Sequence, residues 1–134
     1  MNILEEAAAT LETGHWCTGS IKDGDKFCAV GAIGFHMGLY TMETTRNEVN
    51  DGPDVYSAVR AHPAGKALAD EVIKSDWYHD AKAEWNEELD GEFWIDSYYI
   101  AEQWDDVIVE FNDAQESAEP VIELFKHAAK QLDS

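Results

Sequence analysis

A short turn signal near the N-terminus constrains the fold most, because the patterns on both sides of it are helical. Asp23-Gly24 separates two short runs that suit β-strands, residues 16–21 and residues 27–28. Asp-Gly between such runs is typical of a hairpin. The runs leave room for only a small ladder, so we predict an α+β fold that is mainly helical, with a small β-hairpin near residues 15–28.

The segment before this hairpin is predicted to be a helix. Asn2 can cap its first turn, and Glu5 stands three residues later, as in a capping box. Apolar residues recur at helical spacing from Leu4 to Leu11, and Gly14 follows where a left-handed residue often ends a helix.

The segment after the hairpin, residues 29–39, has helical spacing and three glycines. Gly31, Gly34 and Gly38 fall roughly on one side of it. Each glycine inside a helix costs about 1 kcal/mol relative to alanine. We therefore expect another element to pack closely against the backbone of this helix.

The remaining segments complete one domain over residues 1–134, since no linker or repeat divides the chain. Residues 41–52 are polar and are predicted to form a loop. We predict short helices at 53–61 and 63–75, a short strand or buried turn at 107–109, and a last helix capped by Ser117 with a clear apolar face.

Charge excludes several classes of function. Aspartate and glutamate number 28 and lysine and arginine 9, which gives a formal net charge of -19. Nucleic-acid phosphates and anionic membranes both require clustered positive charge, so we expect direct binding to neither. The N-terminus has acids where a signal peptide has bases, and no apolar run nears the ~20 residues that span a bilayer. We expect a cytoplasmic protein.

Residues 76–111 form an acidic, aromatic-rich segment that we predict to carry a binding surface. They hold nine of the 15 aromatic residues, more than a minor helical layer needs, so some rings should be exposed. Exposed aromatics anchor interfaces, and acids around them steer a basic partner. The candidate anchors are Trp77, Trp85, Trp94 and Trp104, and the candidate rim residues are Glu84, Glu87, Glu88, Asp90 and Glu92.

Two stretches carry a resemblance to a known family. They are His15-Trp16-Cys17-Thr18-Gly19 through Cys28-Ala29-Val30-Gly31-Ala32-Ile33, and Phe111-Asn112-Asp113 before the Ser117 helix. With the first helix, they resemble an uncharacterised family of small proteins from actinobacteria and their bacteriophages. In that family a Trp-Cys hairpin precedes a Cys-x-x-Gly-Ala helix, and Trp-Asn-Asp precedes the last helix; Phe111 stands here in place of that tryptophan. The resemblance implies a bacterial or phage cytoplasmic setting and marks residues 76–111 as an insertion, and it brings no established activity.

Cys17 and Cys28, with His15 and His36 nearby, are the candidates for other chemistry. Thiolate and imidazole suit zinc, but a zinc knuckle needs two close ligand pairs, and two cysteines are too few for a disulfide scaffold. If Asp23-Gly24 centres the hairpin, the cysteines are diagonal neighbours on one face. We favour two buried thiols packed under Trp16, while a metal site, a redox pair and a Cys17 nucleophile with a histidine base are the alternatives.

The expected function is non-enzymatic, with no cofactor and no metal. Such a chain would bind a basic protein, or occupy the DNA-binding surface of a nucleic-acid-binding protein by presenting carboxylates where phosphates lie. The alternative is a small enzyme or metal-binding protein centred on Cys17, Cys28 and the nearby histidines. The oligomeric state does not follow from the sequence.

Overall fold

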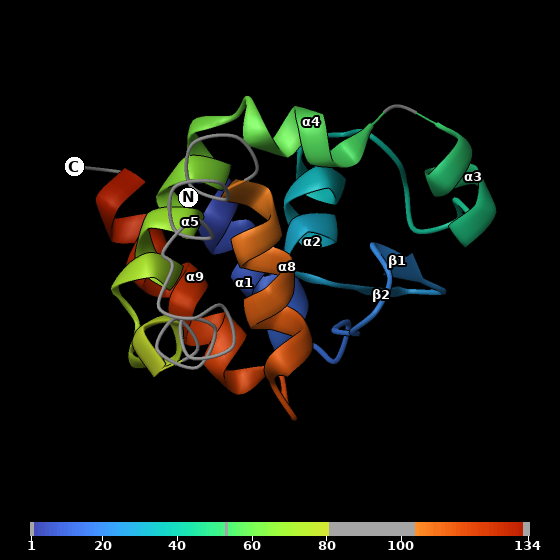
Figure 1. Cartoon of the computed structure of the whole chain (residues 1–134). Coiled ribbons are helices and arrows are strands. Elements are labelled where there is room, and N and C mark those ends of the chain that lie inside the picture. Colours follow the sequence, from blue (N-terminus) through green and yellow to red (C-terminus); the bar gives the residue numbers. More distant parts are fainter. Residues whose placement is uncertain (1, 53, 81–103, 133–134) are drawn as a thin grey trace, which may run out of the picture.

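The computed structural model describes residues 2–52, 54–80 and 104–132, apart from the side chains of residues 104–106. The described part is mainly helical, with a two-stranded antiparallel hairpin at one side (Figure 1). This confirms the predicted α+β class. The helices are α1 (Ile3–Glu12), α2 (Ala29–His36), α3 (Arg46–Asp51), α4 (Val55–Arg60), α5 (Pro63–Lys74), α8 (Trp104–Ala114) and α9 (Glu119–Leu132), and the strands are β1 (Lys22–Asp23) and β2 (Lys26–Phe27).

Helices distant in the sequence enclose one core. The helix α9 packs against both α1 and α5, while α8 packs across α5 and contacts α2. The side chains of Leu4, Ile33, Leu68, Ile108 and Phe125 come from α1, α2, α5, α8 and α9 and are all fully buried. No described helix is both long and apolar enough to cross a membrane.

The first helix forms as its sequence predicts. The Asn2 side chain accepts hydrogen bonds from the backbone N–H groups of Leu4 and Glu5, and the Glu5 carboxylate accepts from the N–H of Asn2, which is a complete capping box. Gly14 has a φ of 87°, the left-handed conformation expected after the helix end. The Asn2 amide also donates to the carbonyl of Ala129 at 3.0 Å, so the start of α1 is tied to α9.

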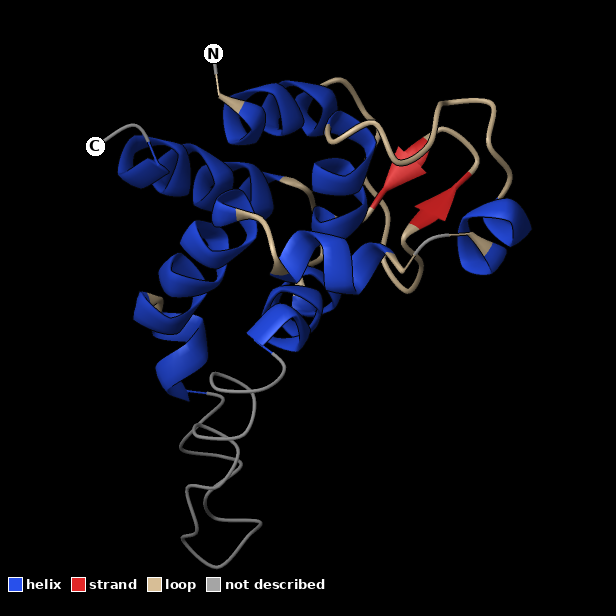
Figure 2. Ribbon diagram, turned by 90° about the horizontal axis from the view of Figure 1, so that it is seen from above, coloured by secondary structure: helices blue, strands red, loops and turns tan. Residues whose placement is uncertain are grey.

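The hairpin is confirmed, and a third segment pairs with it. Lys22 pairs with Phe27 and Asp23 with Lys26, around a turn in which Gly24 has a φ of 63°. The predicted diagonal relationship of the two cysteines across this hairpin is wrong, because residues 15–17 run parallel to β2 along its other edge. Figure 2 shows the hairpin beside the helices, with α3 beyond it.

Two of the three glycines in the segment 29–39 allow close packing, and the third ends the helix. A Cβ at Gly31 would clash with the backbone oxygen of Ile21, and one at Gly34 would lie 2.9 Å from Cγ1 of Val55. Gly38 lies beyond α2 with a φ of 83°, so its place in the predicted helix is wrong. Its left-handed conformation ends the helix, and the N–H of Leu39 that follows donates back to the carbonyl of Gly34 at 3.2 Å.

Three other predictions differ from the structure. Residues 46–51 form α3 rather than a loop, because Thr45 and Glu48 make a capping box, a signal that the sequence does contain. Residues 107–109 lie within α8 rather than in a strand or turn, and Val107 and Ile108 are buried by its packing. The last helix begins at Glu119, so Ala118 rather than Ser117 precedes it. The short helices predicted around 53–61 and 63–75 appear as α4 and α5.

A candidate functional site around Asn112

Asn112 on α8 is a fully buried polar residue at the centre of a hydrogen-bond network. Its Oδ1 accepts from the indole Nε1 of Trp16 at 2.7 Å and from the backbone N–H of Ala29 at 3.1 Å. Its Nδ2 donates to the carbonyl oxygen of Cys17 at 3.1 Å. One amide thereby joins the segment before the hairpin, the start of α2 and α8.

Asp113 extends this network to the surface. Its Oδ1 accepts from the backbone N–H of Gly19 at 3.0 Å and from Nδ2 of Asn112 at 3.1 Å, while the side chain is exposed. The stretches that carry the family resemblance therefore meet in space: residues 15–19, 28–33 and 111–113. Asn112 lies 83 residues from Ala29 and 96 from Trp16 in the sequence. We call Trp16, Cys17, Cys28, Asn112 and Asp113 the Asn112 cluster.

The two thiols of the cluster are poor nucleophiles at neutral pH. Cys28 is buried, and its Sγ accepts from the N–H of Gly31 at 3.4 Å, which caps α2. Burial raises the pKa of Cys28 to about 12. Cys17 is half-buried, and burial together with the Asp23 and Asp113 carboxylates raises its pKa to about 11. Since the thiolate is the reactive form, this environment suppresses nucleophilic chemistry.

The two candidate histidines are engaged elsewhere. Nδ1 of His15 lies 2.7 Å from the carbonyl oxygen of Asp25 and 3.5 Å from its carboxylate. Nε2 of His36 lies 2.7 Å from Oγ1 of Thr10. Neither of these contacts brings an imidazole nitrogen to the thiol of Cys17 or Cys28. Within the described ranges, no three side chains among His, Cys, Asp and Glu converge in a way that could hold a metal ion.

His36 takes part in a contact between α1 and α2 that sequence reasoning missed. Besides Thr10, its Nδ1 lies 3.9 Å from the Glu6 carboxylate. Burial lowers the pKa of His36, and the nearby Glu6 acts in the opposite direction. Glu6 and Thr10 are four residues apart on one face of α1, but nothing in the sequence states that this face meets α2.

The predicted partner surface lies largely outside the described residues. Trp85, Trp94, Glu84, Glu87, Glu88, Asp90 and Glu92 fall within 81–103, and the side chain of Trp104 is also outside the description. Trp77 is described: it is half-buried, and its ring is perpendicular to that of Phe111 at a centroid distance of 5.4 Å. Its side chain therefore has both a packed part and an exposed part.

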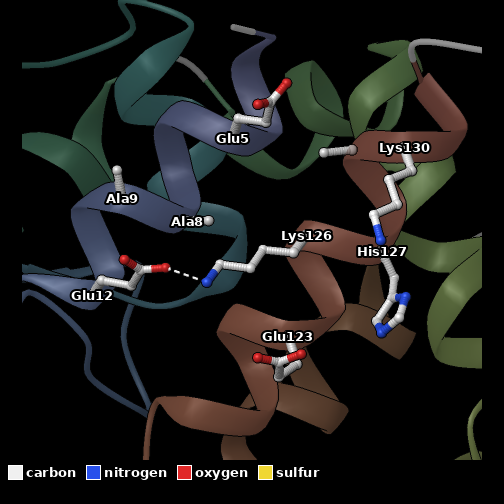
Figure 3. Close-up of a pocket in the computed structure, with 9 residues that line it drawn as sticks. Glu5, Ala8, Ala9, Glu12, Glu123, Lys126, His127 and Lys130 are labelled. Atoms are coloured by element: carbon white, nitrogen blue, oxygen red, sulfur yellow. Dashed lines mark ion pairs between the residues drawn. The ribbon is translucent and has the colours of Figure 1, made fainter.

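A groove of about 580 Å³ lies between α1 and α9. Figure 3 shows Glu5 and Glu12 on α1 across from Lys126, His127 and Lys130 on α9, with the alanines Ala8, Ala9 and Ala129 among the lining residues. Nζ of Lys126 lies 2.7 Å from Oε1 of Glu12 and bridges the two helices. Glu123 on α9 adds a third carboxylate to this face, so three acids and two lysines line the groove.

Comparison with known proteins identifies one family. The model of a family of unknown function, DUF6197, matches residues 1–131. No curated protein matches the chain. No solved structure matches it either.

Proposed function

Because the chain belongs to the family of unknown function DUF6197, we propose its function from its own charge and contacts: it is a non-enzymatic interaction protein of a bacterial or phage cytoplasm. Its acidic, aromatic surface within residues 76–111 binds a basic protein. The basic surface most complementary to it is one that normally contacts DNA phosphates, because clustered lysines and arginines are what such a surface provides.

The observation that carries this proposal is the exposed charge on the described segments that flank residues 81–103. Asp76 and Asp80 are exposed before them, and Glu110 and Asp113 are exposed on α8 after them. The sequence of α8 contains four acids and no base. An acidic field that continues across both flanks attracts a basic partner over a wider surface than the central segment alone.

Trp77 supplies a described example of a candidate anchor. Its contact with Phe111 holds the ring in place, and the half-buried side chain still has accessible surface. A ring that is already held in place loses little conformational freedom on binding, which favours affinity. The acids around it would mainly set the association rate and its salt dependence.

The chemistry-bearing side chains of the Asn112 cluster support a binding role over catalysis. Both thiols are protonated at neutral pH, Cys28 caps a helix, and Asn112 is fully engaged by backbone and indole groups. Such arrangements hold a fold together, and they leave the exposed acids as the surface available for function.

The test is capture from a bacterial lysate at about 50 mM and about 500 mM salt, with identification of what is retained. The variant Glu84→Gln/Glu87→Gln/Glu88→Gln removes three candidate rim charges. The matched control Glu43→Gln/Asp51→Asn/Glu123→Gln removes three exposed acids elsewhere. We expect a basic protein that is lost at high salt and with the rim variant but retained by the control, and that duplex DNA displaces in a purified reconstitution.

Two results would contradict the proposal. One is an equal loss of the captured protein with the rim variant and with the control variant, since binding would then depend on net charge and not on the candidate rim. The other is stoichiometric zinc in the purified protein, which would favour the competing metal-binding hypothesis centred on Cys17 and Cys28.

A further inference from the structure

The backbone places Cys17 and Cys28 side by side. The N–H of Phe27 donates to the carbonyl of His15 at 2.8 Å, and the N–H of Cys17 donates to the carbonyl of Phe27 at 3.0 Å. This parallel bridge pairs Trp16 with Phe27 and makes Cys17 and Cys28 the next two residues in register. Residues paired across neighbouring strands lie about 4.8 Å apart and point to the same face, and disulfides span Cα separations of about 4.4–6.8 Å.

The surroundings hold this pairing in place. Asn112 accepts from the N–H of Ala29 and donates to the carbonyl of Cys17, so a single buried side chain fixes the backbone beside both cysteines. The two groups are also close enough to interact electrostatically, since the pKa of Cys28 is raised in part by Cys17. Both sulfurs are free thiols in the structure.

We propose that Cys17 and Cys28 are a modification site: a preorganised dithiol that a peroxide converts to an intramolecular disulfide. The half-buried Cys17 is the sulfur that a small oxidant reaches, and the buried Cys28 is the sulfur that resolves the product. Nothing in this inference depends on the proposed binding function.

The reaction balances with hydrogen peroxide as the oxidant. The Cys17 thiolate attacks one peroxide oxygen, the O–O bond breaks, and sulfenic acid and hydroxide form. The Cys28 sulfur then attacks the Cys17 sulfur, the S–O bond breaks, and water leaves as the S–S bond forms. Two thiols and one peroxide give one disulfide and two waters. Because only the thiolate reacts, and Cys17 has a pKa of about 11, the rate should rise roughly tenfold per pH unit between pH 7 and 10.

Oxidation would convert a hydrogen-bonded junction into a covalent one. The thiol of Cys17 donates to the carbonyl of Ser20 at 3.6 Å, a contact that the disulfide removes. In exchange, the disulfide closes the loop from Cys17 to Cys28 in the unfolded chain. This lowers the conformational entropy of the unfolded state and so stabilises the folded state. We expect the melting temperature of the oxidised protein to rise by several degrees.

The test treats the reduced, full-length folded chain with excess hydrogen peroxide at pH 9 and follows intact mass and peptide maps. We expect a loss of about 2 Da, disappearance of both alkylatable thiols and a Cys17–Cys28 cross-linked peptide. The inference is overturned if both thiols persist, if Cys17 accumulates as sulfinic acid while Cys28 stays free, or if the products are disulfide-linked dimers.

Two single-serine variants provide matched controls. Serine is nearly isosteric with cysteine, and it is a favourable N-cap, so Cys28→Ser should still cap α2. Cys17→Ser should leave Cys28 unmodified under the same treatment, because Cys28 is buried. Cys28→Ser should give a sulfenic acid or an intermolecular disulfide at Cys17 and no rise in melting temperature. Rapid oxidation of Cys28 in the Cys17→Ser variant would contradict the assigned order of attack.

Discussion

Trp16 and Asn112, 96 residues apart in the sequence, are joined by a 2.7 Å hydrogen bond from the indole Nε1 to the amide Oδ1. The same oxygen accepts from the N–H of Ala29, so one buried atom satisfies donors from two other segments. The junctions of α8 with the segment before the hairpin and with the start of α2 therefore depend on one side chain.

Asn112→Ala should be among the most destabilising single changes in the described part of the chain. It leaves the Trp16 indole N–H, the Ala29 N–H and the Cys17 carbonyl without their partner, and each unsatisfied buried group costs about 1–3 kcal/mol. We expect a loss of about 3 kcal/mol or more in a urea titration. The control is Gln115→Ala, one turn further on, which removes a single hydrogen bond to the carbonyl of Phe111. It should cost no more than about 1 kcal/mol, and equal losses would show that the cluster is not a centre of stability.

Gly31→Ala and Gly34→Ala, on the same helix, should differ sharply. Alanine adds about 1 kcal/mol of helix propensity at either position. At Gly31 the new Cβ meets the backbone oxygen of Ile21, which cannot move without disrupting the hairpin. At Gly34 it meets side-chain atoms instead, Cγ1 of the buried Val55 at 2.9 Å and the hydroxyl oxygen of Tyr40 at 3.2 Å, which can shift more readily than backbone. We expect a loss above about 3 kcal/mol for Gly31→Ala and a smaller loss, about 1–3 kcal/mol, for Gly34→Ala. Thermal unfolding of the two variants measures both losses, and a lower melting temperature for Gly34→Ala than for Gly31→Ala would contradict this prediction.

The thiols should react slowly in the folded protein. The pKa of Cys17 is raised from 9.0 to about 11, which lowers its thiolate fraction at neutral pH by roughly 100-fold. Iodoacetamide labelling at pH 7.5 should modify Cys17 first and Cys28 only after unfolding, and both should label rapidly in denaturant. Fast native labelling of Cys28 would show that the start of α2 opens readily.

His36 should make the protein less stable as the pH falls. Burial lowers its pKa in the folded state, so the unfolded chain binds the proton more readily. The contribution to stability is complete above the unfolded value near 6.5 and is lost as the pH falls from there through the lowered folded value. Glu6 opposes the shift, so Glu6→Gln should lower the folded pKa of His36 further and steepen the loss.

The His36→Gln variant isolates this effect from the other histidines. Its melting temperature should depend less on pH between 7 and 5 than that of the unchanged protein. NMR titration of the His36 ring gives the direct measurement. A ring that titrates above 6.5 in the folded protein would mean that the Glu6 contact outweighs burial.

The local elements of this fold could be predicted from the sequence because their determinants lie within a few residues of one another. Asn2 and Glu5 close a capping box across three residues, and Asp23-Gly24 sets a turn whose strands adjoin it. Thr45 and Glu48 carry the same kind of signal for α3, although the polar composition around them obscured it. The thiols and histidines could be picked out by residue type alone, but their hydrogen-bond partners could not.

The tertiary structure decided which residues meet. An asparagine at position 112 has the same sequence signature whether it is exposed or buried, and only the packing of α8 against α5 and α2 buries it and aligns it with Trp16, Cys17 and Ala29. That packing also makes residues 107–109 helical, although their β-branched side chains favour strands. The first helix cap, the hairpin turn and the net charge follow from the sequence alone, since these depend on neighbours along the chain or on composition. The Asn112 cluster, the Cys17–Cys28 register and the Thr10–His36 contact needed the tertiary fold, because each joins groups whose separation along the chain carries no local signal.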